Sequence, residues 1–141
     1  RLRDLLSQGQ LAQAMRLALE DAGLQPDAIG YVNAHGTATD HGDIAETTAT
    51  ASVFGQRMPI SSLKSYVGHT LGACGAYESW ITLEMMREGW FAPTLNLEER
   101  DPRCADLDYI TGEGRELQTD YVMNNNFAFG GINTSLVLRR A

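Results

Sequence analysis

Residues 29–54 read IGYVNAHGTATDHGDIAETTATASVF, and this stretch joins two different hydrophobic patterns. The run 29–34 is short and mostly apolar, with β-branched and aromatic members, which is typical of a buried strand. His35 and the glycine after it end that run. The run 40–54 favours a helix, because Asp40 can cap its start and its apolar residues share one face. The stretch therefore predicts a strand, a loop and a helix.

Outward from this stretch the same alternation continues in both directions. Apolar residues three and four positions apart indicate a preceding helix, and Gly23 follows where such a helix commonly stops. We read 64–72 as an irregular loop, because it is rich in glycine and polar residues. Strands that alternate with helices indicate an α/β layered fold. The other expected elements are helices over 10–22 and 73–88 and strands over 58–63, 107–110, 121–127 and 134–140.

The composition is that of a folded globular protein. The 141 residues are 43% hydrophobic and 21% charged, and that length suits one domain or half of a larger one. The net charge of −7 argues against a nucleic-acid surface, which needs clustered basic residues. No apolar run reaches the roughly 18 residues of a membrane span, and the first residues lack the features of a secretory signal. We therefore expect a cytoplasmic location with no membrane or nucleic-acid partner.

The two cysteines do not suggest a structural framework. Cys74 and Cys104 lie thirty residues apart, with no second pair and no CxxC spacing. Neither a disulfide framework nor a zinc site is indicated, so reduced thiols are expected.

The residues that favour chemistry are two histidines at the ends of predicted elements. His35 and His69 are both flanked by glycine, and Lys64 precedes the second by five residues. Together with Asp43 and Glu46 the histidines could offer nitrogen and oxygen ligands to a metal ion, but their spacing matches no compact motif such as HExxH. A serine hydrolase is disfavoured as well, because the chain has no GxSxG sequence.

Three segments carry a resemblance to a known family. They are HGTAT at 35–39, SLKSYVGHTLGACGA at 62–76 and NFAFGGIN at 126–133, with APTLNL at 92–97 between them. In order and spacing they resemble the C-terminal signatures of β-ketoacyl-acyl-carrier-protein synthases. The resemblance covers about residues 10–140 and implies the C-terminal half of a thiolase-like fold, a mixed sheet with helices packed on it.

This resemblance implies a role for each matching residue. His35 and His69 would hold the malonyl thioester carbonyl and promote decarboxylation, as imidazoles suited to hydrogen bonding and proton transfer near neutral pH. Lys64 would be the active-site lysine, held by a carboxylate such as Glu46 or Glu78 and acting as an electrostatic support. Asp43 and Glu46 can otherwise be read as first-turn helix stabilisers.

The glycine-rich segment would complete the site. Phe129 would lie on the loop whose backbone N–H contributes to the oxyanion hole, and its ring would gate the acyl pocket. Asn126 and Asn133 would hold this loop through side-chain hydrogen bonds. Cys74 stands where the family usually has alanine, and we expect it only to pack. The expected substrate-binding residues are Thr37, Thr39, Phe127 and Gly130.

Two departures from the family pattern matter. Ala128 and Ile132 replace the usual glycine and threonine of the loop, which should make the loop stiffer. The nucleophilic cysteine of the family belongs to its N-terminal half, and no segment here offers that context. The chain alone is therefore expected to be inactive.

The parent protein implied by the resemblance is an acyltransferase. It would carry out decarboxylative Claisen condensation of malonyl carrier protein with an acyl-enzyme thioester, in fatty-acid or polyketide-type synthesis. It would need no metal or redox cofactor, because the phosphopantetheine arm belongs to the acyl carrier protein. The expected partners are that carrier protein, the N-terminal half of the same enzyme, and a second copy or a chain-length factor. The alternative is a non-catalytic subunit resembling a chain-length factor; a thiolase proper would need a C-terminal CxG sequence, which is not found.

Overall fold

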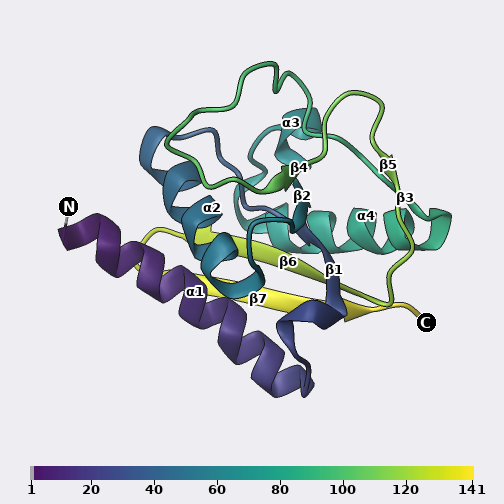
Figure 1. The fold of residues 1–141 in the computed structure, drawn as a ribbon, viewed down its shortest axis with the longest axis horizontal. Coiled ribbons are helices and arrows are strands. Elements are labelled where there is room, and N and C mark those ends of the chain that lie inside the picture. The colour runs from purple at the N-terminus through teal and green to yellow at the C-terminus, as the bar shows by residue number, and fades with distance from the viewer. Residues whose placement is uncertain (1) are drawn as a thin grey trace.

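The structure, a computed structural model, describes the backbone of residues 2–141 and the side chains of residues 8–141. Helices and strands alternate along most of the chain, and a long hairpin closes it (Figure 1). The helices are α1 (Leu2–Ala22), α2 (Asp40–Phe54), α3 (Lys64–Val67) and α4 (Cys74–Glu88), with 3-10 turns η1 (Pro26–Ala28) and η2 (Leu71–Ala73). The strands are β1 (Ile29–Asn33), β2 (Pro59–Ser61), β3 (Trp90–Phe91), β4 (Asp108–Tyr109), β5 (Arg115–Glu116), β6 (Tyr121–Ala128) and β7 (Ile132–Arg139).

Five of these strands form one mixed sheet in the order β4-β2-β1-β6-β7. β1 lies parallel to both β2 and β6, and β4 is parallel to β2. β7 is antiparallel to β6, so the sheet ends in the hairpin. β3 and β5 pair separately as a short antiparallel ribbon.

The sheet is buried on both faces, and the side chains of its central strands alternate between two cores. Val32 and Met123 face the core that includes Met15 of α1 and Ala49 of α2. Their neighbours in the sequence, Tyr31 and Val122, belong with Met85, Met86 and Phe91 to the second core, on the side of α4. Figure 1 shows α1 and α2 on one side of the sheet and α4 on the other. This is the layered α/β arrangement that the sequence predicts.

Most predicted elements are confirmed, and the differences have local causes. The prediction of an irregular loop over 64–72 was wrong, because α3 and η2 both lie there. α3 is a single turn that ends at Gly68, whose φ of 74° is left-handed, and it is anchored by the buried Lys64. Tertiary contacts therefore stabilise a turn that its composition does not favour. β3 and β5 were missed because each has two residues, and α1 begins before the predicted 10–22.

Among the described residues, none of the helices combines the length and the apolar character that a membrane crossing would require.

Candidate functional site

Three segments meet where the central parallel strands end. His35 follows β1, Lys64 follows β2, and Phe127 lies near the end of β6. Because β1, β2 and β6 are parallel neighbours, their carboxyl ends lie at one edge of the sheet. The β1 and β2 connections lead to helices on opposite faces, and such a switch in direction is where α/β sheets place their sites.

The two predicted histidines come together at this edge. The ring centroids of His35 and His69 lie 5.3 Å apart, and the ring planes are nearly perpendicular, at 89°. Burial is the main cause that lowers the pKa of His35 to about 4, and the positive charge of Lys64 and the His69 ring contribute to the same shift. His35 is therefore neutral near pH 7. Its Nδ1 atom is buried and has no hydrogen-bond partner within the part of the chain that the structure describes.

Glu46 holds the backbone that carries His35. One carboxylate oxygen accepts a hydrogen bond from the backbone N–H of His35 and the other accepts one from Gly36, both at 2.8 Å. Burial raises the pKa of Glu46 to about 7, although the two N–H groups oppose that shift. Gly36 is required here, because its φ is 45° and a Cβ atom would lie 2.6 Å from the side chain of Ser62.

A buried ion pair joins α3 to α4 beside this site. Lys64 Nζ is 2.5 Å from Glu78 Oε1, and the side chains are 5% and 1% exposed. The second oxygen of Glu78 accepts hydrogen bonds from Asn126, at 2.8 Å, and from Asn33, at 3.5 Å. Asn33 Nδ2 also donates to Asn124 Oδ1 at 2.7 Å. A buried ion pair is stable only with such additional partners, so the asparagines and the pair form one network.

His69 is held by groups that follow it in the sequence. The backbone N–H of Leu71 donates to His69 Nδ1 at 3.1 Å. Cys74 Sγ lies 3.1 Å from the same nitrogen, and the hydroxyl of Thr70 donates to Cys74 Sγ at 3.4 Å. Cys74 is 3% exposed, so it does pack as predicted, but its thiol also contacts a residue of the candidate site.

The glycine-rich segment divides between the site and solvent. The Phe127 ring lies 6.0 Å from the ring of His35. Phe129 is fully exposed at the hairpin turn, beside Gly130 and Gly131, which have φ values of 85° and 80°. Asn133 pairs with Phe127 across the ladder. Phe129 and Gly130 therefore lie in solvent at the turn and do not contact the histidines in this structure.

Ala128 occupies a position where glycine is not needed. It lies in β6 and pairs with Ile132, the first residue of β7. The left-handed φ values of the turn fall on Gly130 and Gly131 instead. The alanine therefore extends the regular hairpin by one pair without strain.

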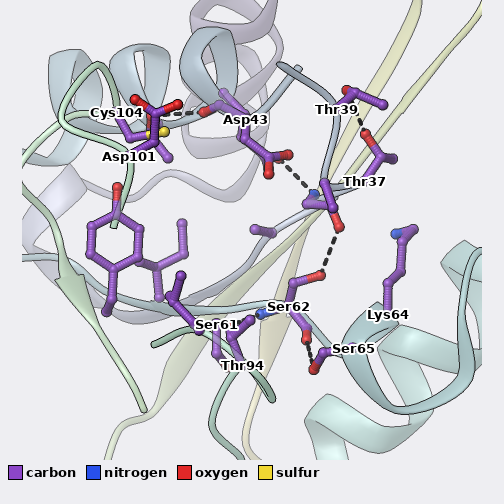
Figure 2. Close-up of a pocket in the computed structure, with 18 of the residues that line it drawn as sticks. Thr37, Thr39, Asp43, Ser61, Ser62, Lys64, Ser65, Thr94, Asp101 and Cys104 are labelled. Carbon is purple, nitrogen blue, oxygen red and sulfur yellow. Dashed lines mark hydrogen bonds between the residues drawn. The ribbon is translucent and has the colours of Figure 1, made fainter. Parts of the chain in front are cut away.

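A pocket of about 830 Å³ opens beside the site, between the segment after β1, α2, α3 and the segment after β3. Lys64 and His69 are among the residues that line it. Thr37 and Thr39 also line it, and their hydroxyls are hydrogen-bonded to each other at 3.0 Å (Figure 2). Asp43 lines it too, and burial raises the pKa of its carboxyl. Within the described residues, no three His, Cys, Asp or Glu side chains are grouped so that they could hold a metal ion.

The structure decides between two partners that the sequence left open for Lys64, and it adds two contacts that the sequence analysis did not contain. The carboxylate partner of Lys64 is Glu78, whereas Glu46 binds backbone N–H groups, because α2 directs it at the loop after β1. Sequence reasoning missed Asn33, although a polar residue at the end of an otherwise apolar strand is a signal for it. It also missed the contact of Cys74 with His69, for which the sequence offers only the separation of five residues.

Comparison with known proteins agrees with the predicted family. A model of the family described as beta-ketoacyl synthase, C-terminal domain, matches residues 5–98. The 3-oxoacyl-[acyl-carrier-protein] synthase 2 of Coxiella burnetii is 45% identical over 129 residues, which are 89% of this chain and 31% of that protein.

Solved structures extend the match over nearly the whole chain. A beta-ketoacyl synthase from Burkholderia phymatum is 69% identical, with a TM-score of 0.93 over 94% of this chain and 33% of that one. A chain in the structure of a ketosynthase with its chain length factor, from Xenorhabdus doucetiae, is 36% identical, with a TM-score of 0.86 over 92% of this chain and 33% of that one. The predicted thiolase-like fold is confirmed, and the chain spans about a third of the length of these relatives.

Proposed function

The chain belongs to the family of β-ketoacyl synthase C-terminal domains, and we propose on this basis that it supplies the decarboxylating part of a condensing active site. The parent protein would be an acyltransferase that joins a malonyl unit to an acyl-enzyme thioester. The observation that carries the proposal is the meeting of His35 and His69, whose rings lie 5.3 Å apart, beside the buried pair of Lys64 and Glu78.

In this proposal the two histidines bind the thioester carbonyl of a malonyl group. When the bond to the carboxylate breaks, carbon dioxide leaves and its bonding electron pair forms an enolate. N–H donors aimed at the enolate oxygen stabilise the charge that develops there. The enolate carbon then attacks the acyl thioester, and the thiolate of the nucleophile leaves. Because His35 is neutral near pH 7, it would donate a hydrogen bond to the enolate oxygen from an uncharged ring.

Lys64 supplies a positive charge to the site without being a nucleophile. Its ammonium is held by Glu78 at 2.5 Å, so it is not free to form a covalent intermediate. Its positive charge also lowers the pKa of His35. We assign Asn33 and Asn126 the role of positioning Glu78.

The remaining parts of the cycle are assigned to partners. The nucleophilic cysteine would lie in the part of the relatives' length that this chain does not span. Thr37 and Thr39, whose hydroxyls line the pocket, would contact the phosphopantetheine arm of an acyl carrier protein, with Phe127 and Gly130 also on the substrate path. Phe129 would gate the acyl pocket once the segments that cover it are in place. No metal or redox cofactor enters the proposal, and the active form would be a dimer.

The substitution His69→Ala in the full-length protein tests the proposal. It should abolish the decarboxylation of malonyl carrier protein, because one of the two donors to the enolate oxygen is lost; one such donor is worth roughly 3 kcal/mol in comparable sites. Acylation of the nucleophile should remain measurable, since that step does not form an enolate. Release of labelled carbon dioxide and mass spectrometry of the acyl-enzyme measure the two steps separately.

The matched control is His41→Ala, which removes an exposed histidine from the first turn of α2. It should leave both steps unchanged. Normal carbon dioxide release by the His69 variant would overturn the assignment. The isolated 141-residue chain should show no condensation, and turnover by it would mean that a nucleophile lies within these residues.

A second candidate function is a non-catalytic subunit like a chain length factor. The similarity to the Xenorhabdus doucetiae complex is the observation that supports this second function, because that structure contains a chain length factor. A subunit that only shapes a cavity has no need of two facing histidines, which favours the catalytic proposal. The residue at the nucleophile position of the full-length protein separates the two.

A further inference from the structure

Cys74 is the first residue of α4, and its thiol lies against His69. Sγ is 3.1 Å from His69 Nδ1 and 3.4 Å from Thr70 Oγ1. The side chain is 3% exposed, whereas His69 and Thr70 are exposed in this chain. The thiol therefore contacts the histidine from its protein side and leaves the other side of the ring free.

The hydrogen bonds around the ring fix the direction of each donor. The backbone N–H of Leu71 can only donate, and it points at His69 Nδ1 from 3.1 Å. Nδ1 must therefore carry a lone pair, and the ring proton resides on Nε2. Facing this lone pair, the thiol of Cys74 can only donate its own proton. The Thr70 hydroxyl donates to Sγ, so the hydroxyl, the thiol and the imidazole form a chain that runs one way.

The backbone is shaped to allow this contact. Leu71 has a φ of 52°, a left-handed conformation that a leucine rarely adopts. This turn, continued by η2, brings Cys74 back to the ring of a residue five positions earlier. Backbone strain of this kind persists where the surrounding contacts hold it, and it is common at functional sites.

We propose that Cys74 is a positioning residue for His69: its thiol, held by the Thr70 hydroxyl, donates a second hydrogen bond to Nδ1 and so holds Nε2–H toward the substrate. The inference rests on the proposed function, in which Nε2–H of His69 binds the enolate oxygen. An alanine at position 74 leaves the Leu71 N–H as the sole donor to Nδ1 among the described residues. The thiol orients the ring more narrowly, because the Leu71 N–H and the thiol share the one lone pair of Nδ1 and together restrict the rotation of the ring.

The test uses Cys74→Ala and Cys74→Ser in the full-length protein. In Cys74→Ala the loss of one hydrogen bond should lower kcat for malonyl decarboxylation by between about twofold and tenfold. The KM for malonyl carrier protein should change little, because the affected contact strengthens in the transition state. Cys74→Ser keeps a donor at nearly the same place, so it should restore most of kcat.

A spectroscopic readout reports the contact without any turnover. With ¹⁵N-labelled histidine, the Nδ1 resonance of His69 should move in Cys74→Ala toward the position of a less hydrogen-bonded imine nitrogen. It should stay near the wild-type position in Cys74→Ser. Thr82→Val is the control for disturbance of α4, because Thr82 is buried on the same helix and its hydroxyl has no hydrogen-bond partner among the described residues. This variant should leave both the resonance and kcat unchanged.

The outcomes separate the two proposals. If Cys74→Ser is as slow as Cys74→Ala, or if the Nδ1 resonance is the same in all three proteins, the thiol only fills space and the inference is wrong. If His69→Ala decarboxylates normally, the proposed function fails, while the resonance still decides whether Cys74 donates to the ring. A shift in Cys74→Ala that Cys74→Ser reverses, together with the loss of kcat, supports the inference.

Discussion

Glu46 is a buried carboxylate whose two oxygens face backbone N–H groups and not a cation. Burial raises its pKa from an ordinary value of 4.5 to about 7. Between these values the unfolded chain releases a proton that the folded chain keeps. The free energy of unfolding therefore falls as the pH rises through this window, by roughly 3 kcal/mol at most. Below pH 4.5 this contribution to stability is fully present.

The substitution Glu46→Gln should remove this pH dependence. The amide does not ionise, so the full-length variant should lose less stability than the wild type between pH 4.5 and 7. The glutamine amide nitrogen cannot accept the hydrogen bond from one of the two N–H groups, so the variant should be less stable than the wild type at pH 5. Urea unfolding followed by fluorescence at both ends of the window measures the difference. Glu20→Gln, an exposed carboxylate on α1, is the control; an unchanged pH slope in Glu46→Gln would contradict the prediction.

At this scale the sequence predicts residue identities better than partners. His35 and His69 were found because both are flanked by glycine near element ends, and Lys64 was found because it precedes His69 at the spacing of the family motif. The choice between Glu46 and Glu78 as partner of Lys64 could not be made, because both lie on helices and only the packing decides which side each faces. The role of Asn33 depends on a neighbour ninety-one positions away, Asn124.

The contact between α4 and β6 depends on a glycine. A Cβ atom at Gly75, in the first turn of α4, would lie 2.8 Å from Asn126 Oδ1 on β6. Asn126 cannot move freely, because its amide donates to Glu78 at 2.8 Å. The small residues at the start of α4 therefore let β6 approach closely enough to complete the network around Lys64.

The effect of Gly75→Ala on the free energy of unfolding should depend on whether Asn126 is present. In the wild type it should destabilise the full-length protein by about 1–3 kcal/mol, because the methyl group displaces Asn126. In the Asn126→Ala background the same substitution should be neutral or stabilising by up to about 1 kcal/mol, because alanine has a higher helix propensity than glycine. Thermal unfolding of the four proteins of the cycle measures this. Equal losses in both backgrounds would mean that Asn126 is not what Gly75 accommodates.

Elements with a clear period were predicted well, and elements set by tertiary contacts were not. The ends of the strand over 29–34 and of the helix over 40–54 were predicted within a residue or two, because His35, Gly36 and Gly55 mark where these elements stop. α3 has no such pattern, and its single turn depends on the buried side chain of Lys64. The strands β3 and β5 have two residues each, which is too few for an alternation of apolar and polar residues to be recognised in the sequence.

In the whole molecule, the region of η2 and α4 carries two of the large apolar residues that are exposed, Leu71 and Trp80. On α4 the side chains of Glu78, Thr82 and Met85 are buried, whereas Trp80 points away from them and is 60% exposed. Leu71 of η2, which packs against α4, is 76% exposed. Exposed apolar residues that gather on one face mark an interaction surface. Because the chain spans about a third of its relatives' length, the partner we expect on this face is the remainder of the same protein.

When the remainder of the protein is absent, Trp80 and Leu71 stay exposed to water. The isolated chain should therefore self-associate through the outer face of α4, because a second copy can cover these two side chains. Trp80→Glu should shift it toward the monomer in light scattering after size exclusion, because a charge at the centre of the contact opposes burial. Leu17→Glu is the matched control, as Leu17 is 54% exposed on α1, which packs on the opposite face of the sheet. Co-expression with the rest of the protein should give a complex in which the Trp80 fluorescence is shifted to the blue. If both glutamate substitutions shift the chain toward the monomer equally, association depends on overall hydrophobicity, and the outer face of α4 is not the contact surface.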